Sequence, residues 1–160
     1  MGNRAVVGWI DSKGHWNHHS VGVYLHWNGG RDSIEAFLAY CKACGFRSPI
    51  EDDYGLARFV QVVANFFGPD GLSIGVNRVD SLDADNGDNG LYICRGWEIF
   101  ERQHFDGEEQ QEHDFLEMLK EINIRQPKDM QLSDEMLAGL ALDHANPAEK
   151  KASVFAPEDM

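Results

Sequence analysis

The sequence has few cysteines, little positive charge and no long apolar run. Its three cysteines follow no framework spacing, which favours a reducing compartment over a disulfide-rich secreted scaffold. No stretch reaches the roughly 18 apolar residues of a membrane span, and no basic region followed by an apolar segment stands at the N-terminus. We therefore expect a cytoplasmic protein without membrane contacts.

Signatures of catalysis are also missing. The chain contains no GxSxG nucleophile elbow, no GxxxxGK phosphate loop and no HExxH zinc motif. Cys41 and Cys44 have redox spacing, but they fall in the last turn of a predicted helix, where no helix N-terminus lowers the pKa of a thiol. We expect no enzyme, no catalytic residue, no metal and no cofactor.

Acidic residues dominate the charge, and they are unevenly placed. The formal net charge is −13, and from Glu101 onward 15 Asp and Glu face 6 Lys and Arg. Direct nucleic-acid binding through a basic patch is therefore not expected. The same asymmetry motivates one alternative, an acidic DNA mimic that inhibits a restriction or CRISPR enzyme. A mimic is expected, however, to spread its carboxylates over the folded core.

Apolar periodicity predicts an α+β fold for residues 1–105. The expected strands and helices are Arg4 to Ile10, Val21 to Trp27, a helix from Asp32 to Cys44, a helix from Tyr54 to Phe67, then strands from Leu72 to Arg78, Leu91 to Cys94 and Trp97 to Phe105. Asp32 and Glu35 have the spacing of a capping box, and Gly45 is placed to close the first helix. Short turns between consecutive strands predict an antiparallel sheet, with the two amphipathic helices on one face.

Residues 106–160 are expected to form a separate acidic helical extension and tail. Residues 108–112 are read as a solvated acidic connector, followed by a helix from about Asp114 to Asn123. Ser133 can cap a further helix. The chain after Pro147 has the composition of a frayed tail.

Two copies of a tight-turn signal stand together in Asp85-Asn86-Gly87-Asp88-Asn89-Gly90. The loop from Asp80 to Gly90 is longer than the roughly 2–5 residues of most hairpin loops, and it is rich in amides and carboxylates. Calcium is disfavoured because Cys94 stands where the bidentate glutamate of a calcium loop is needed. A plain turn and a small-ligand contact both remain open.

The segment Trp27-Asn28-Gly29-Gly30-Arg31 joins an aromatic face, an amide and a guanidinium at a strand-to-helix junction. Such groups hold nucleotide-like ligands. Equally, Trp27 can cover the core while the glycines turn the chain. Arg31 and Arg58 are the residue-based candidates for phosphate, with Arg102 as a further one.

Three histidines in the first loop suggest a last alternative. His15, His18 and His19 lie beside Trp16, and a metal-dependent hydrolase would use such ligands. They have no companion Cys or carboxylate at metal-ligand spacing, so exposed loop histidines are the simpler interpretation.

Three blocks carry a resemblance: Tyr24 to Ser33, Asp53 to Arg58 with Asn65 to Gly68, and Asp85 to Tyr92. Together they resemble the phage-encoded Thoeris anti-defence sponges, over roughly residues 1 to 105. The resemblance implies an α+β protomer that forms a homodimer or a larger homo-oligomer. It also implies that the protein sequesters a cyclic ADP-ribose isomer made by a TIR-domain enzyme, without cleaving it. Some relatives are thought to hold cyclic oligonucleotides at separate sites.

The resemblance makes an asparagine of the tandem turn a ligand contact, either Asn86 or Asn89. With the residue-based candidates, the expected ligand-binding set is Trp27, Asn28, Arg31, Arg58, Asn86, Asp88, Asn89 and Arg102.

Overall fold

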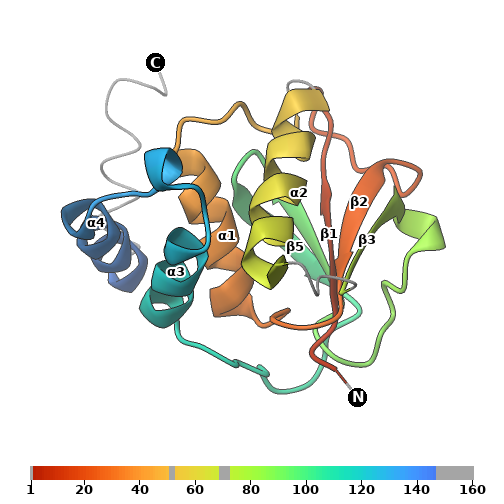
Figure 1. The fold of residues 1–160 in the computed structure, drawn as a ribbon. Helices are drawn as coiled ribbons and strands as arrows, with labels where there is room; N and C mark the ends of the chain where they lie inside the picture. The colour runs from red at the N-terminus through yellow and green to blue at the C-terminus, as the bar shows by residue number, and fades with distance from the viewer. Residues whose placement is uncertain (1, 51–52, 69–72, 147–160) are drawn as a thin grey trace.

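The computed structural model describes residues 2–50, 53–68 and 73–146 (Figure 1). Its elements are β1 (Ala5–Trp9), β2 (Val21–Leu25), α1 (Arg31–Ala43), α2 (Asp53–Phe67), β3 (Ile74–Arg78), η2 (Val79–Ser81), β4 (Leu91–Arg95), β5 (Glu98–Gln103), α3 (Phe115–Ile124), η3 (Lys128–Met130) and α4 (Asp134–Ala145). Leu72 and the tail from Pro147, both named above, lie outside the described residues. The helices of the described part are all too short or too polar to cross a membrane.

The α+β class is confirmed, but the sheet is mixed rather than antiparallel. Its strand order is β3-β2-β1-β4-β5. Three neighbouring pairs are antiparallel, whereas β1 and β4 are parallel, with Val6 opposite Leu91 and Trp9 opposite Cys94. The expectation failed because short turns fix the direction of consecutive strands only. Between β1 and β4 the described part of the chain passes through β2, α1, α2, β3 and η2.

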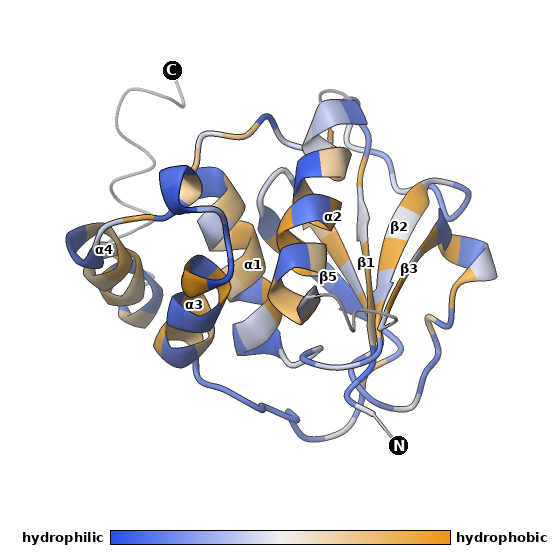
Figure 2. Ribbon diagram, in the orientation of Figure 1, coloured by the Kyte–Doolittle hydropathy of each residue, from blue (hydrophilic) through white to orange (hydrophobic). Residues whose placement is uncertain are grey.

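One face of the sheet packs against α1 and α2. Alternate residues of β1, namely Ala5, Val7 and Trp9, belong to the main core together with Phe37 of α1 and Phe59 of α2. The ring of Phe59 meets that of Trp9 edge-on at 5.0 Å. Figure 2 shows apolar residues alternating with polar ones along these helices and strands. Burial of this face supplies the main driving force for folding.

The other face of the sheet is partly covered by loops. Trp16 from the β1–β2 loop and Val79 of η2 pack there with Val6 and neighbouring apolar residues. Gly8 and Gly22 make room for them, because a Cβ at either position would lie within 2.8 Å of Trp16 or Val79. Trp16 therefore belongs to a second, smaller core.

The α3 helix is part of the main core. Asp114 and Glu117 form a reciprocal capping box that starts the helix. Phe115, Met118 and Leu119 belong to the same buried cluster as the residues of α1 and α2. The boundary expected after residue 105 thus falls between β5 and a helix that shares the core of the sheet.

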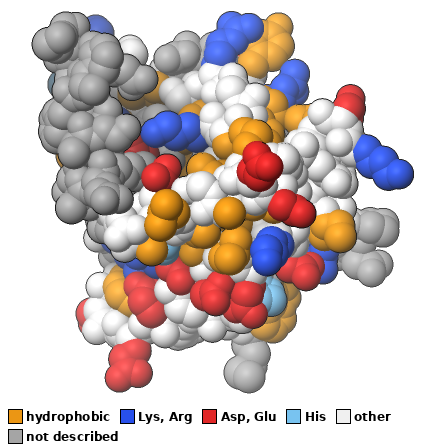
Figure 3. Space-filling view, turned by 90° about the vertical axis from the view of Figure 1, so that its left-hand side faces the viewer, with side chains coloured by type: hydrophobic (Ala, Val, Ile, Leu, Met, Phe, Trp, Pro, Cys, Tyr) orange, Lys and Arg blue, Asp and Glu red, His pale blue; other side chains and the backbone are white. Residues whose placement is uncertain are grey.

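The α4 helix lies outermost. Ser133 caps it, as expected, by accepting a hydrogen bond from the Met136 N–H. Leu137 is buried, whereas Met136 and Leu142 remain exposed. Figure 3 views the molecule from the side that carries α4 and shows apolar side chains mixed with acidic ones.

The capping box expected at the start of α1 is wrong. The helix begins at Arg31 after Gly30, which has no side chain to cap it, so Asp32 already lies in the first turn. Gly45 follows the helix with a φ of 75°, the left-handed conformation expected for a residue that ends a helix.

Candidate functional site

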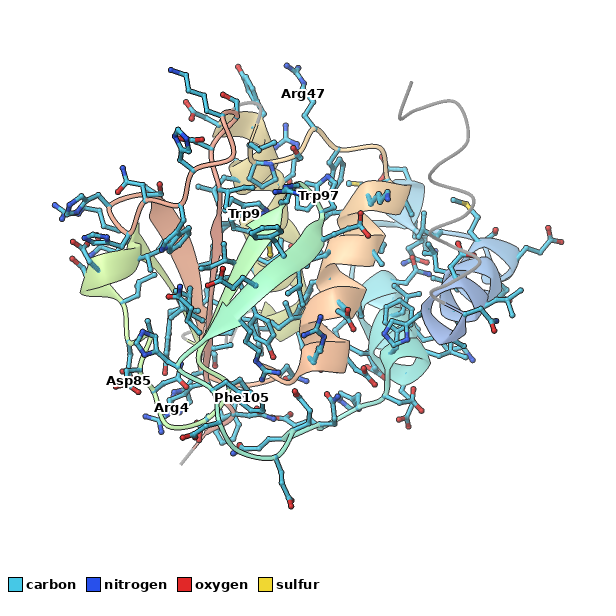
Figure 4. All side chains as sticks on the ribbon, turned by 180° about the vertical axis from the view of Figure 1, so that it is seen from behind. Arg4, Trp9, Arg47, Asp85, Trp97 and Phe105 are labelled. Carbon is cyan, nitrogen blue, oxygen red and sulfur yellow. The ribbon has the colours of Figure 1, made fainter. Side chains whose placement is uncertain are left out.

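Most of the expected ligand-binding residues gather at one end of the sheet. The pairing of Ala5 with Leu25, of Val6 with Leu91 and of Leu91 with Gln103 brings the starts of β1 and β4 beside the ends of β2 and β5. The segments 27–31 and 85–90 and the residue Arg102 therefore meet at this end. Figure 4 shows Arg4, Asp85 and Phe105 there, away from Trp9 and Trp97.

Arg58 does not join this group. It is exposed on α2, and the ring of its neighbour Phe59 packs between Trp9 and Trp97. Those tryptophans mark the opposite end of the strands (Figure 4).

Asn86 builds the tandem turn from the inside. Its side chain is 4% exposed. The amide group donates to the carbonyls of Asp83 and Gly90, at 2.9 and 3.2 Å, and the amide oxygen accepts from the N–H groups of Asp88 and Gly90, at 2.9 and 3.0 Å. These bonds use the hydrogen-bonding capacity of the amide inside the loop.

Asn89 joins the tandem turn to the start of β1. Its side chain is fully buried and donates to the side-chain oxygen of Asn3 and to the carbonyl of Arg4, the latter at 3.0 Å. Arg102 donates to the backbone carbonyl of Asn89 at 3.0 Å and to its amide oxygen at 3.4 Å. The side-chain amides of both asparagines thus bond within the protein and hold the turn in this conformation.

A cavity of about 320 Å³ opens beside the outer side of the turn. Its lining residues are Asp85, Gly87, Asp88, His104, Phe105, Asp106, Gly107 and Gln110. Gly87 and Gly90 have left-handed φ values of 77° and 73°. At Gly90 a Cβ would lie 2.2 Å from the carbonyl oxygen of Gln103, so glycine is what lets the turn approach the end of β5.

The wall of the cavity is acidic but partly neutralised. The carboxylate of Asp88 accepts from the Arg4 side chain at 2.7 Å and from its backbone N–H at 3.1 Å. Burial alone would raise the pKa of Asp88, but the bonds from Arg4 outweigh it and hold that pKa below its usual value. The Arg4 guanidinium is a third exposed and lies 3.6 Å from Asp83.

Arg102 is held between two aromatic rings. Its guanidinium lies 4.5 Å from the centre of the Tyr92 ring and 3.5 Å from that of Phe105. The side chain is 9% exposed and pairs with Glu109. His104, between Arg102 and the connector, has a φ of 58°, a conformation uncommon outside glycine. The backbone therefore turns sharply where Phe105 meets the cavity.

The residues of the segment 27–31 differ in their exposure and in their contacts. Trp27 is 42% exposed, so it does not cover the core. Asn28 is buried with a φ of 58°, and its side chain faces the sulfur of Met118 at 3.7 Å. The Arg31 side chain is 41% exposed and lies 3.6 Å from Glu35.

A second cavity, of about 180 Å³, lies between α1, α4 and the β4–β5 hairpin. His144 on its wall stacks on Phe115 at 4.0 Å, and its Nε2 lies 3.0 Å from Glu35 and 3.7 Å from Asp32. Burial raises the pKa of Asp32. No local motif marks this cluster, because His144 stands 109 residues from Glu35 in the sequence.

The first-loop histidines acquire a carboxylate that sequence spacing did not reveal. Nδ1 of His19 lies 2.9 Å from Asp80, and His18 completes an exposed cluster. Arg78 also donates to both His19 and Asp80, at 2.6 Å each. A cation there would have to displace a guanidinium that is always charged. The cluster is thus a weaker metal site than its residue types suggest.

Comparison with known proteins gave no match to a family model, to a curated protein or to a solved structure. The resemblance to the sponges therefore stays a hypothesis, and function has to be inferred from the residues of the site.

Sequence reasoning missed several residues of the cavity end. Arg4, Phe105 and Glu109 were not among the expected site residues. Arg4 reaches Asp88 only because β1 and β4 are parallel neighbours. Phe105 and Glu109 enter through the chain that follows β5. No local motif marks contacts of this kind, whereas Asp85 lay in the recognised turn itself.

Proposed function

We propose that the protein captures a small phosphate-bearing nucleotide in the cavity beside the tandem turn and does not cleave it. One observation carries the proposal. The two asparagines turn inward and hold the loop, which leaves Asp85, Gly87 and Asp88 on the wall of a cavity shared with Phe105. Binding residues held on a loop by a rigid scaffold are a common arrangement in ligand-binding proteins.

The side chains of the cavity match the parts of a nucleotide. An aromatic ring such as Phe105 can stack on a base, and carboxylates such as those of Asp85 and Asp106 can accept from ribose hydroxyls. The partly exposed guanidinium of Arg4 is 3.9 Å from a Cβ position at Gly87 and can reach a phosphate. A cyclic ADP-ribose isomer, the signal class that the resemblance suggests, carries all three groups.

Capture without cleavage needs no serine or cysteine nucleophile in the described cavity. Its lining residues include no Ser and no Cys. Cys41 and Cys94 are fully buried, and burial raises the pKa of both thiols, which disfavours the nucleophilic thiolate. Sequestration needs tight binding and slow release, and no general acid or base.

The biological setting in the proposal follows the resemblance. The protein would act in the host cytoplasm as a phage anti-defence sponge. Pockets for drug-sized ligands span about 300–1,000 Å³, so a cavity of about 320 Å³ is at the small end for a cyclic dinucleotide-like signal. A second copy of the chain in a homo-oligomer would enlarge the enclosure.

Capture and release tests the proposal. The protein is incubated with an extract of an activated TIR-domain enzyme, washed and heat-denatured, and the released molecules are identified by mass spectrometry. We expect an intact cyclic ADP-ribose isomer from the wild type and a large loss in Phe105→Ala. The control Phe100→Ala changes a half-exposed ring on β5, the strand that precedes Phe105, and should release the same amount as the wild type. Recovery of no nucleotide, or of cleaved product only, would refute the proposal.

A further inference from the structure

The α1 helix starts without a cap of its own. Gly30 precedes the helix and has no side chain to accept from the first free N–H groups. Those groups and the helix dipole favour an anion or a polar oxygen. In the structure the oxygens come from the connector, because the N–H of Arg31 donates to Glu109 at 3.2 Å and that of Asp32 to Gln111 at 3.0 Å.

The connector lies across this helix end as a strap, which we define as Glu109 to Glu112. Glu112 accepts from the N–H of Asn28 at 3.2 Å, and the carbonyl of Gln110 accepts from the Asn3 side chain at 2.7 Å. A Cβ at Gly30 would lie 2.6 Å from that same carbonyl. Figure 2 shows the hydrophilic connector running from β5 to α3 along this end of the molecule. Residues 108–112 are exposed, as expected for a solvated connector, but their polar groups also accept hydrogen bonds from the start of α1.

Within the strap, the carboxylate of Glu109 contacts both α1 and β5. One oxygen of its carboxylate accepts from the Arg31 N–H, and the other contacts the guanidinium of Arg102. The side chain of Arg102 is 9% exposed and lies between the rings of Tyr92 and Phe105, and its pair with Glu109 is at the exposed edge of this arrangement. An anionic group is thus bound between a buried guanidinium and a helix N-terminus. Both features are typical of phosphate sites.

Two further features belong to the same end of the molecule. Ser33, in the same first turn of α1, has a fully buried hydroxyl that lacks a hydrogen-bond partner within the described residues. Phe105, which covers Arg102, and Gln110 of the strap also line the cavity beside the tandem turn. A molecule in that cavity lies next to the site that Glu109 fills.

We propose that Glu109 is an internal competitor that occupies the phosphate subsite formed by Arg102 and the start of α1, and that a phosphate of the bound ligand displaces it. The nucleotide nature of that ligand rests on the function proposed above. Displacement has an energetic consequence, since a site that is open in only a fraction of molecules binds with an affinity reduced by that fraction. The strap thereby also explains how an acidic protein can hold a buried arginine without a ligand.

Binding of inorganic pyrophosphate tests the competitor directly. Calorimetric titration compares the wild type with Glu109→Gln, which keeps the side-chain shape but removes the charge. Glu108→Gln is the matched control, because it removes the same charge from an exposed neighbour. We expect Glu109→Gln to bind pyrophosphate at least about tenfold more tightly than either of the others. Adding Arg102→Gln should abolish the gain.

Equal affinity in Glu109→Gln and Glu108→Gln would overturn the proposal, because the effect would then be general charge repulsion. Hydrogen exchange supplies a second readout: the amide of Arg31, which donates to Glu109, should exchange faster in Glu109→Gln, and pyrophosphate should restore its protection. If the pyrophosphate gain appears but no nucleotide is captured, the strap stands and the proposed function fails. If nucleotide is captured equally by the wild type and Glu109→Gln, the function stands and the strap fails.

Discussion

At the scale of single residues, the asparagines of the tandem turn were expected to contact a ligand, whereas in the structure their side chains bond within the protein. Asn-Gly spacing correctly indicated a turn, because Gly87 and Gly90 take the left-handed φ values that such turns need. The direction of the amides was not encoded in that spacing. For Asn89 that direction depends on Arg4, just before β1, and on Arg102 of β5, whereas the partners of the Asn86 amide all lie within the loop itself.

Asn89→Ala should therefore destabilise the fold. Removing the buried amide leaves the carbonyl of Arg4 and the side chain of Asn3 with fewer partners, and we expect the free energy of unfolding to fall by about 2–4 kcal/mol. Urea denaturation measures it. Asn77→Ala is the control, since Asn77 is exposed and should change stability by at most about 0.5 kcal/mol. Equal stability of the two variants would contradict a structural role for Asn89.

Asp88 makes the stability of the turn depend on pH. Its folded pKa lies below the unfolded value of about 3.8, so its contribution is present above about pH 4 and is lost as the pH falls through the folded pKa. At pH 7 we expect Asp88→Asn to lower the free energy of unfolding by about 1–2 kcal/mol. Denaturation between pH 7 and 2 should show the gap between variant and wild type closing at the acidic end. A gap that stays constant would exclude this ionic contribution.

At the scale of elements, local sequence patterns predicted the helices and strands, but they did not predict contacts between residues far apart in the sequence. The helices and strands follow from apolar spacing, and Ser133 was recognised as a cap because its partner is three residues away. The caps of α1 were missed, since Glu109 and Gln111 stand 78 and 79 residues from the N–H groups they accept from. The parallel pairing of β1 with β4 was not predicted for the same reason, because the two strands are far apart in the sequence.

Substitutions of glycine test how closely the loops pack against the sheet. Gly22→Ala places a Cβ 2.7 Å from Val79 and 2.8 Å from the carbonyl of Val7, and we expect a loss of about 1–3 kcal/mol. Gly139→Ala is the matched substitution, because a Cβ at Gly139 meets nothing within 4 Å. Gly139 lies inside α4, where alanine should raise the free energy of unfolding by about 0.5–1 kcal/mol. Thermal denaturation should shift the two variants in opposite directions. A shift in the same direction would show that the loop does not rest on Gly22.

At the scale of the whole molecule, α3 shares one core with the sheet. Met118→Ala removes a side chain that is fully buried among residues of that core, and we expect a loss of about 2–5 kcal/mol. Met136→Ala alters a side chain that is 46% exposed on α4 and should cost at most about 0.5 kcal/mol. Chemical denaturation should show a single transition in both variants. Separate transitions would mean that residues 106–146 unfold as an independent unit.

Some of the acidic side chains also have hydrogen-bond or ion-pair partners within the protein. Glu109 and Glu112 accept from backbone N–H groups, and Asp88 pairs with Arg4. Carboxylates engaged in this way are not displayed as a mimic of nucleic acid would need, so the charge asymmetry alone gives the DNA-mimic alternative little support. The site itself was only partly predictable, because it forms where four strand ends meet and the connector crosses them.

A crystal structure of the protein loaded with the nucleotide that it captures tests the central claim most directly. We expect ligand density between Phe105 and Gly87, with a phosphate on Arg102 and the carboxylate of Glu109 withdrawn from it. Density elsewhere, for example in the cavity beside His144, or a structure that remains empty at saturating nucleotide, would contradict the account.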